Sequence, residues 1–256
     1  MKLPRYLSLA ILALCIGGAT ASATSIIQIP AASFVAGSGL ITFSEKALGT
    51  VNPTYVPADY GGGIGSPTVT FEGFFSGQSL GATCGGVASG CVLGTPSNPL
   101  TLDGASPNTF IVGDGANPTS PVLSGTPTFN GPISMLFDVD MAGVGLDGGF
   151  FNAIGGTAIK AFARDGTLLG QVTNGALAIE FLGLVTDDGS EKIAGLQFSI
   201  VGPEPAGFAI DNVRFGRTGQ VVVPPNPIPE PTTMLLLGSG LLGLPAMIRR
   251  KRASRS

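Results

Sequence analysis

Glycine and proline punctuate this sequence so densely that its apolar residues fall into short runs. The chain of 256 residues contains 40 glycines and 20 prolines. Both residues destabilise the interior of an α-helix, so most of these runs are too interrupted to form long helices. A hydrophobic fraction of 44% is nevertheless too high for a disordered chain. The sequence therefore predicts a folded domain built from short β-strands and many loops.

Several of the runs alternate between apolar and polar residues, which is the pattern of a half-buried strand. Strands are predicted at residues 40–44, 68–75, 109–112, 133–139, 157–163, 168–172, 177–181, 193–200 and 208–215. The sequence Arg-Asp-Gly-Thr at 164–167 predicts a hairpin turn. Outside the termini, no helical pattern exceeds two turns. The predicted fold class is all-β, with a single β-sandwich body at residues 24–220.

The first 23 residues have the three parts of a signal peptide. Lys2 and Arg5 supply positive charge, residues 7–16 form an apolar stretch, and an Ala-Ser-Ala sequence ends at Ala23. The apolar stretch is too short to be a permanent membrane span. We expect export through the Sec translocon, with cleavage after Ala23.

The last part of the chain combines an apolar stretch with a basic end. No charged residue lies between 231 and 248, and these 18 residues would form a helix of about 27 Å, close to the thickness of a bilayer core. A transmembrane helix is predicted at about 232–248, preceded by a Pro-rich linker at 221–227. Its basic end is expected on the cytoplasmic side, and it comprises Arg249, Arg250, Lys251 and Arg252 of the tail 249–256.

The C-terminal features together resemble a known sorting signal. Pro229, Glu230 and Pro231, followed by the apolar span and the basic end, are similar to the PEP-CTERM signal of Gram-negative bacteria, here at residues 228–256. The resemblance implies that an exosortase, a membrane protease-transpeptidase, recognises the tail after export and removes it. It also implies a host that makes exopolysaccharide or biofilm matrix. We expect transient anchoring in the inner membrane, followed by release to the cell surface or extracellular matrix.

The charge of the body restricts its partners. Residues 24–227 contain six basic and 15 acidic residues, a net charge of −9. Such a surface repels phosphate backbones, so nucleic acid is not an expected partner. The chain has no histidine, which excludes imidazole bases and Ser-His-acid triads, and no tryptophan to stack on sugars.

Cys84 and Cys91 are the cysteines left after signal removal, and they flank a Gly-rich stretch. In an exported protein we predict a disulfide between them, closing a small loop. A redox role would require a tighter C-x-x-C sequence near a helix start, and neither is present.

The body loosely resembles the jelly-roll domains of carbohydrate-binding modules. The similar segments are 41–51, 159–172, 181–200 and 207–216. In related folds, an acidic residue that ends the first strand and an aspartate in the last strand help to hold a structural Ca²⁺. Glu45 and Asp211 match those positions, whereas Ca²⁺ needs six to eight oxygen ligands. The alternative is that Asp211 caps a turn and Glu45 is solvated. No other cofactor is expected.

Two apparent motifs lack the context they need. The G-x-S-x-G sequence around Ser79 has no histidine to accept its proton. The G-x-G-x-x-G sequence at 143–148 is followed by a stretch too short and glycine-rich for the helix of a dinucleotide site, and a loop is predicted there.

Carboxylates on the body are predicted to be ordinary surface groups. Asp138 and Asp140 lie two residues apart and could, with Asp147, bind a cation or form a catalytic pair. Solvent-facing acids at a strand end explain them more simply, and Asp187 and Asp188 indicate a turn.

These observations favour a non-enzymatic protein of the cell surface or extracellular matrix, associated with exopolysaccharide. One alternative is a secreted glycan-binding module that uses the loop containing Tyr55 and Tyr60. A carboxylate-dependent glycan hydrolase is the less favoured alternative.

Overall fold

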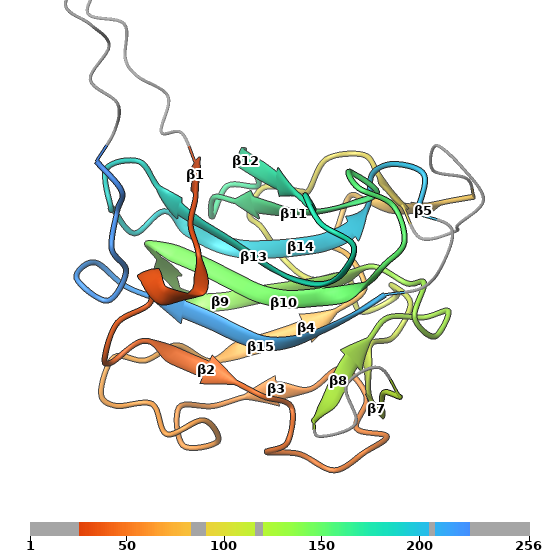
Figure 1. The fold of residues 1–256 in the computed structure, drawn as a ribbon, viewed down its shortest axis with the longest axis horizontal. Helices are drawn as coiled ribbons and strands as arrows, with labels where there is room; N and C mark the ends of the chain where they lie inside the picture. The colour runs from red at the N-terminus through yellow and green to blue at the C-terminus, as the bar shows by residue number, and fades with distance from the viewer. Residues whose placement is uncertain (1–25, 83–90, 116–119, 205–207, 226–256) are drawn as a thin grey trace, which may run out of the picture. The chain divides into compact units, whose positions relative to one another are not determined.

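The computed structural model describes residues 26–82, 91–115, 120–204 and 208–225 (Figure 1). Over these ranges the chain forms strands and one short 3₁₀-helix, η1 (Ala31–Ser33), with no α-helix. The strands are β1 (Ile26–Gln28), β2 (Gly39–Ile41), β3 (Thr54–Tyr55), β4 (Val69–Glu72), β5 (Ser79–Gly81), β6 (Cys91–Leu93), β7 (Phe110–Gly113), β8 (Pro121–Ser124), β9 (Ile133–Met141), β10 (Gly143–Phe151), β11 (Thr157–Phe162), β12 (Leu168–Thr173), β13 (Ala178–Thr186), β14 (Ile193–Ile200) and β15 (Ala209–Gly216). The all-β prediction is confirmed, while the predicted signal and C-terminal helices lie outside the described residues.

The strands form two sheets. The first sheet has the order β1-β13-β10-β15-β8-β7, and β2 also pairs with β15. The second sheet has the order β12-β11-β14-β9-β4-β3, and β6 joins it through a parallel pairing with β14. The other pairings in both sheets are antiparallel, which short loops can connect.

The hydrophobic core lies between the two sheets, as expected for a sandwich. Leu182 and Ile210 of the first sheet belong to the same buried cluster as Phe71 and Phe198 of the second. Several aromatic rings meet edge to face in this layer; the centroids of Phe198 and Phe208 are 4.7 Å apart. The sandwich is therefore held together by side chains from both sheets.

All nine predicted strands are present, with ends that differ by a few residues from the prediction. The predicted turn at 164–167 joins β11 to β12, where Gly166 has a φ of 84° and Ala163 N donates to Thr167 O (2.9 Å). Most strands that the sequence pattern missed are four residues or shorter, namely β1, β3, β5, β6 and β8.

The prediction of a loop at residues 143–148 is wrong, because these residues begin β10 in the middle of the first sheet. A Cβ atom on Gly145 would lie 2.5 Å from Cζ of Phe181, and one on Gly148 would lie 2.6 Å from Cζ of Phe151. Neighbouring aromatic rings thus occupy the space above these glycines. The glycines serve close packing within a strand rather than a turn.

The body extends beyond the predicted boundary at residue 220. Val221 is 7% exposed, forms a bridge with Phe34, and packs with Val223 in a small apolar cluster. Val222 N donates to Ser33 O (2.8 Å). Residues 221–223, predicted as linker, are held by the body because their apolar side chains have a partner surface there. The compact unit ends at Val223.

Candidate functional site

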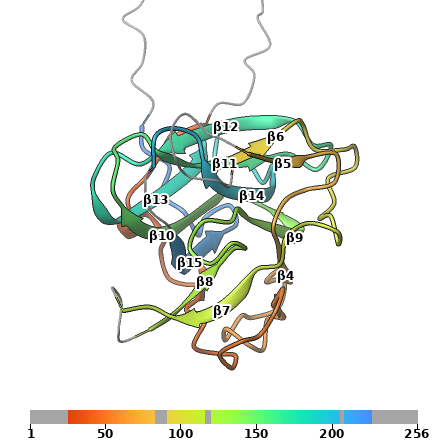
Figure 2. The ribbon, with the colours of Figure 1, turned by 90° about the vertical axis from the view of Figure 1, so that its right-hand side faces the viewer.

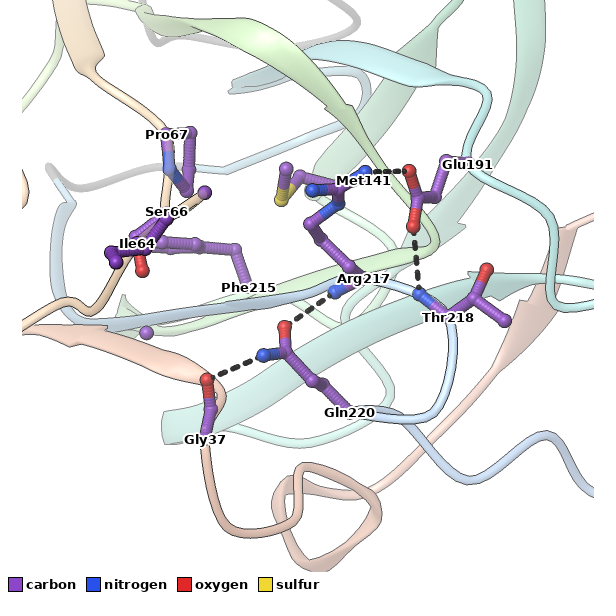
Figure 3. Close-up of a pocket in the computed structure, with 12 residues that line it drawn as sticks. Gly37, Ile64, Ser66, Pro67, Met141, Glu191, Phe215, Arg217, Thr218 and Gln220 are labelled. Atoms are coloured by element: carbon purple, nitrogen blue, oxygen red, sulfur yellow. Dashed lines mark hydrogen bonds and ion pairs between the residues drawn. The ribbon is translucent and has the colours of Figure 1, made fainter.

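A cavity of about 250 Å³ opens at one end of the sandwich (Figure 3). Its walls come from the segment before β2, the loop between β3 and β4, Glu191 in the β13–β14 loop, and the chain that follows β15. The lining residues are Gly37, Gly39, Ile64, Gly65, Ser66, Pro67, Met141, Glu191, Phe215, Arg217, Thr218 and Gln220.

The β3–β4 loop is shaped by glycine and held by Tyr60. Gly61 and Gly65 have φ values of 70° and 83°, a backbone conformation that side chains disfavour. The Tyr60 ring packs edge to face on Phe215, with centroids 5.2 Å apart, and its hydroxyl donates to Pro67 O. Tyr60 therefore fixes the loop against β15, while Ile64 to Pro67 of the same loop line the cavity.

The opposite wall is polar. Arg217 Nη2 lies 2.7 Å from Glu191 Oε2, and Glu191 Oε1 accepts from Thr218 N at 3.2 Å. Gln220 Oε1 accepts from Arg217 N (2.9 Å), while its Nε2 donates to Gly37 O (2.8 Å). These bonds connect the residues that follow β15 with the two neighbouring loops, so the wall is preorganised.

The ion pair sets the charge of the site. The hydrogen bond from Arg217 lowers the pKa of Glu191, and the same bond raises the pKa of Arg217, so both are charged at neutral pH. Arg217 Nε is buried without an acceptor among the described residues, while the side chain as a whole is 39% exposed. A polar ligand would find both a donor and an acceptor on this wall.

The other wall is apolar at its rim. Ile64 is fully exposed at the tip of the loop, close to Pro67, while Phe215 and Met141 are buried at the base. Figure 3 shows Ile64, Ser66 and Pro67 on the side of the cavity opposite Glu191. A concave site with an apolar wall and a few fixed polar groups is the general form of a small-ligand site.

Both tyrosines of the predicted glycan-binding loop pack against other rings of the body. Tyr55 is 0% exposed and packs between Phe43 and Phe71, and burial raises the pKa of its hydroxyl. Tyr60 packs on Phe215, and burial raises its pKa to about 12. The hypothesis is wrong for Tyr55, which is fully buried, whereas Tyr60 is partly buried with its ring packed on Phe215.

The two residues predicted to bind Ca²⁺ accept hydrogen bonds from residues that are near them in the sequence. Glu45 Oε1 accepts from N and Oγ1 of Thr42, both at 2.9 Å, and Asp211 Oδ1 accepts from Asn212 N at 2.7 Å. In the described parts of the chain, no three His, Cys, Asp or Glu residues gather closely enough to hold a metal ion. Calcium binding by Glu45 and Asp211 stays a prediction.

The acids considered as a catalytic group lie on different sheets. Asp138 and Asp140 are on β9; Asp138 Oδ1 accepts from Thr68 N (2.8 Å), and Asp140 forms an ion pair with Arg164. Asp147 lies on β10 in the first sheet, where it accepts from Asn212 Nδ2 (2.8 Å). With Asp211 and Asp114, it lines a separate cavity of about 200 Å³.

The remaining sequence features have structural roles where they are described. Ser79 begins the short strand β5 rather than a strand-to-helix turn. Asp188 caps the β13–β14 turn by accepting from the hydroxyl and the backbone N of Ser190, at 2.5 and 3.0 Å, and these two hydrogen bonds lower the pKa of Asp188. Cys91 is disulfide-bonded, whereas Cys84, its predicted partner, lies outside the described residues.

Sequence reasoning missed the polar wall of the cavity. Glu191, Arg217 and Gln220 carry no recognisable motif, and Glu191 is 26 residues from Arg217 in sequence. The one available signal was the glycine-rich sequence at 61–65 in the opposite wall, which by itself indicates only irregular backbone.

With the β-sandwich established, the class of the chain follows from its C-terminus. The PEP-CTERM protein-sorting motif matches residues 227–252, a range that includes Pro229, Glu230, Pro231 and the basic residues 249–252. The resemblance noted in the sequence is thus confirmed, and the chain is an exported β-sandwich protein with an exosortase sorting tail. The motif residues and the predicted span at 232–248 lie outside the described ranges, within which no helix could cross a membrane.

No curated protein matches the sequence. Among solved structures, the chain is similar to a family 11 carbohydrate-binding module of a cellulosomal cellulase of Clostridium thermocellum. The two are 11% identical, the match covers 72% of this chain and 96% of that module, and the TM-score is 0.25.

Proposed function

We propose that this protein is a non-enzymatic component of the cell surface or extracellular matrix, exported by the Sec translocon and sorted by an exosortase. The sorting motif at 227–252 carries the proposal. It begins directly after the compact body, which ends at Val223, and none of the described core residues lies beyond Val223. Removal of the tail therefore leaves the core of the sandwich complete, as release of a folded protein requires.

The intact mass of the protein in culture medium and in membranes tests this proposal. We expect the membrane form to retain Arg249–Ser256 and the extracellular form to lack it. The double variant Pro229→Ala/Pro231→Ala should accumulate in membranes, whereas Pro224→Ala, outside the motif, should be released normally. An extracellular form that still carries Arg249–Ser256 would contradict the proposed sorting.

A second candidate function is binding of a saccharide from the exopolysaccharide in the cavity of Figure 3. Sugars present hydroxyl groups that both donate and accept, and apolar ring faces. Arg217, Glu191 and Ser66 would meet the hydroxyls, while Ile64 and Pro67 would cover a ring face. The cavity of about 250 Å³ suits a single sugar unit better than a long chain segment.

A glycan array probed with the body, residues 24–225, tests this candidate. Arg217→Ala should abolish a signal seen with the wild-type body. Lys192→Ala removes a cation from another surface ion pair, Lys192–Asp188, and should leave the signal unchanged. A signal that survives Arg217→Ala would place the glycan elsewhere. Activity on the host's exopolysaccharide that Asp138→Asn abolishes would instead favour the hydrolase.

A further inference from the structure

The second sheet ends in β12, and within the described residues no strand pairs with its outer edge. β12 pairs with β11 and with no other strand of the described chain, and it lies at the rim of the molecule in both ribbon views (Figures 1 and 2). It is six residues long, whereas the other terminal strands, β1, β3 and β7, have three, two and four. β1 packs near β12 at Gly170 but pairs with β13. An edge strand of this length presents a row of unpaired backbone donors and acceptors.

The sequence of β12 contains none of the residues that usually protect an edge. It reads Leu-Leu-Gly-Gln-Val-Thr, without charge or proline, although the body carries 21 charged residues. Leu168 is 50% exposed, and Gln171 and Thr173 are exposed as well. The bulge in the β11–β12 ladder lies at the Leu168 end, and the pairing is regular from Gly170 to Thr173. Most edge strands carry lysine, proline or a central bulge against pairing with another chain.

We propose that two copies of this chain associate through β12, antiparallel and about a two-fold axis, so that their second sheets become continuous. An antiparallel strand edge supplies the donors and acceptors that a second copy of the same edge requires. A net charge of −9 on residues 24–227 opposes association of two bodies in general, but β12 contributes none of that charge. β12 carries no charged group that would repel an identical strand, so a second copy of the same edge can pair with its backbone.

The contact is short, so its affinity in dilute solution is low. Proteins concentrated on one surface or in a matrix meet at high effective concentration, and weak contacts then become occupied. The association would thus link neighbouring copies where the sorted protein accumulates. This inference does not depend on any ligand in the cavity lined by Glu191 and Arg217.

Sedimentation velocity of the body over about a hundredfold range of concentration tests the proposal. The body, residues 24–225, is suitable because it is a compact unit with its own core. We expect a reversible monomer–dimer equilibrium. Near a two-fold axis, residues 171 of the two copies lie opposite or diagonal to each other, so like charges there repel. Gln171→Lys and Gln171→Glu should each weaken the dimer at least about tenfold, and an equimolar mixture of the two should restore it.

Thr54→Lys is the matched control, because Thr54 is exposed on β3 at the opposite end of the same sheet. It should dimerise like the wild type, and thermal melts should show that all variants are folded. A monomer at every concentration, a dimer unaffected by Gln171→Lys, or open-ended aggregates in place of a dimer would each overturn the proposal.

Discussion

The same substitution at the two tyrosines of the β3 region should change stability in opposite directions. The Tyr55 hydroxyl is buried and has no hydrogen-bond partner among the described residues, whereas the Tyr60 hydroxyl donates to Pro67 O. Replacing either residue by phenylalanine keeps its ring. For Tyr55 the ring contacts with Phe43 and Phe71, both at 6.0 Å between centroids, are preserved. The two variants therefore isolate the contribution of the hydroxyl.

The magnitudes follow from the state of each hydroxyl. A buried polar group without a partner costs about 1–3 kcal/mol, and removing it leaves only a small void, so Tyr55→Phe should stabilise the body by about 1 kcal/mol. Tyr60→Phe removes a hydrogen bond and leaves Pro67 O without this donor, which should destabilise by about 0.5–1.5 kcal/mol. For a domain of about 150–250 residues, 1 kcal/mol corresponds to about 2–4 °C in Tm.

Urea unfolding and calorimetry of the body at pH 7 measure both values. Tyr55→Phe should raise Tm and Tyr60→Phe should lower it, with unchanged denaturant slopes. If Tyr55→Phe lowers stability as much as Tyr60→Phe does, the Tyr55 hydroxyl has a partner such as an ordered water, and the reasoning fails. Retained glycan binding in Tyr55→Phe would be consistent with the buried position of this ring.

Three further predictions concern packing, pH and calcium. Gly145→Ala, whose new Cβ would meet a ring atom at 2.5 Å, should destabilise the body by about 1–3 kcal/mol in urea unfolding, while Gly104→Ala, with no atom within 4 Å, should be near neutral. Burial raises the pKa of Tyr60 in the folded protein from 10.0 to about 12, so the unfolded chain loses this proton at lower pH than the folded protein does. The free energy of unfolding should therefore fall as pH rises from about 10 to 12. A free energy of unfolding that stays constant over this range would contradict the prediction. If Glu45 and Asp211 bind Ca²⁺, calorimetric titration of the chelator-treated body with Ca²⁺ should show heat of binding, and added Ca²⁺ should raise the Tm of the body. No heat and no change in Tm would refute the site.

The strands were predictable because their signal is local. An alternating pattern such as that of β11 or β14 appears within one segment, and glycine or proline marks its ends. β10 was not predictable in this way, since four of its nine residues are glycines. Gly145 and Gly148 are required there by rings from other positions, including Phe181 on β13.

The cavity was not predictable from the sequence for a related reason. Its polar wall is built from Glu191, Arg217 and Gln220, and each is an ordinary surface residue when read in its own segment. The two tyrosines show the reverse case. They were the aromatic residues that a glycan site would use, yet the structure places them against Phe43, Phe71 and Phe215.

By itself the sequence determined the all-β class and the sorting of this protein by an exosortase. A sorting tail is a linear signal, read by other proteins as a contiguous stretch, so residues 227–252 carry their meaning without a fold. The tertiary structure alone decided which hydroxyl is buried, which carboxylate has a partner, where a cavity opens and which strand is left at an edge. These properties depend on which distant segments meet, because burial and hydrogen bonding are supplied by neighbours in space rather than in sequence.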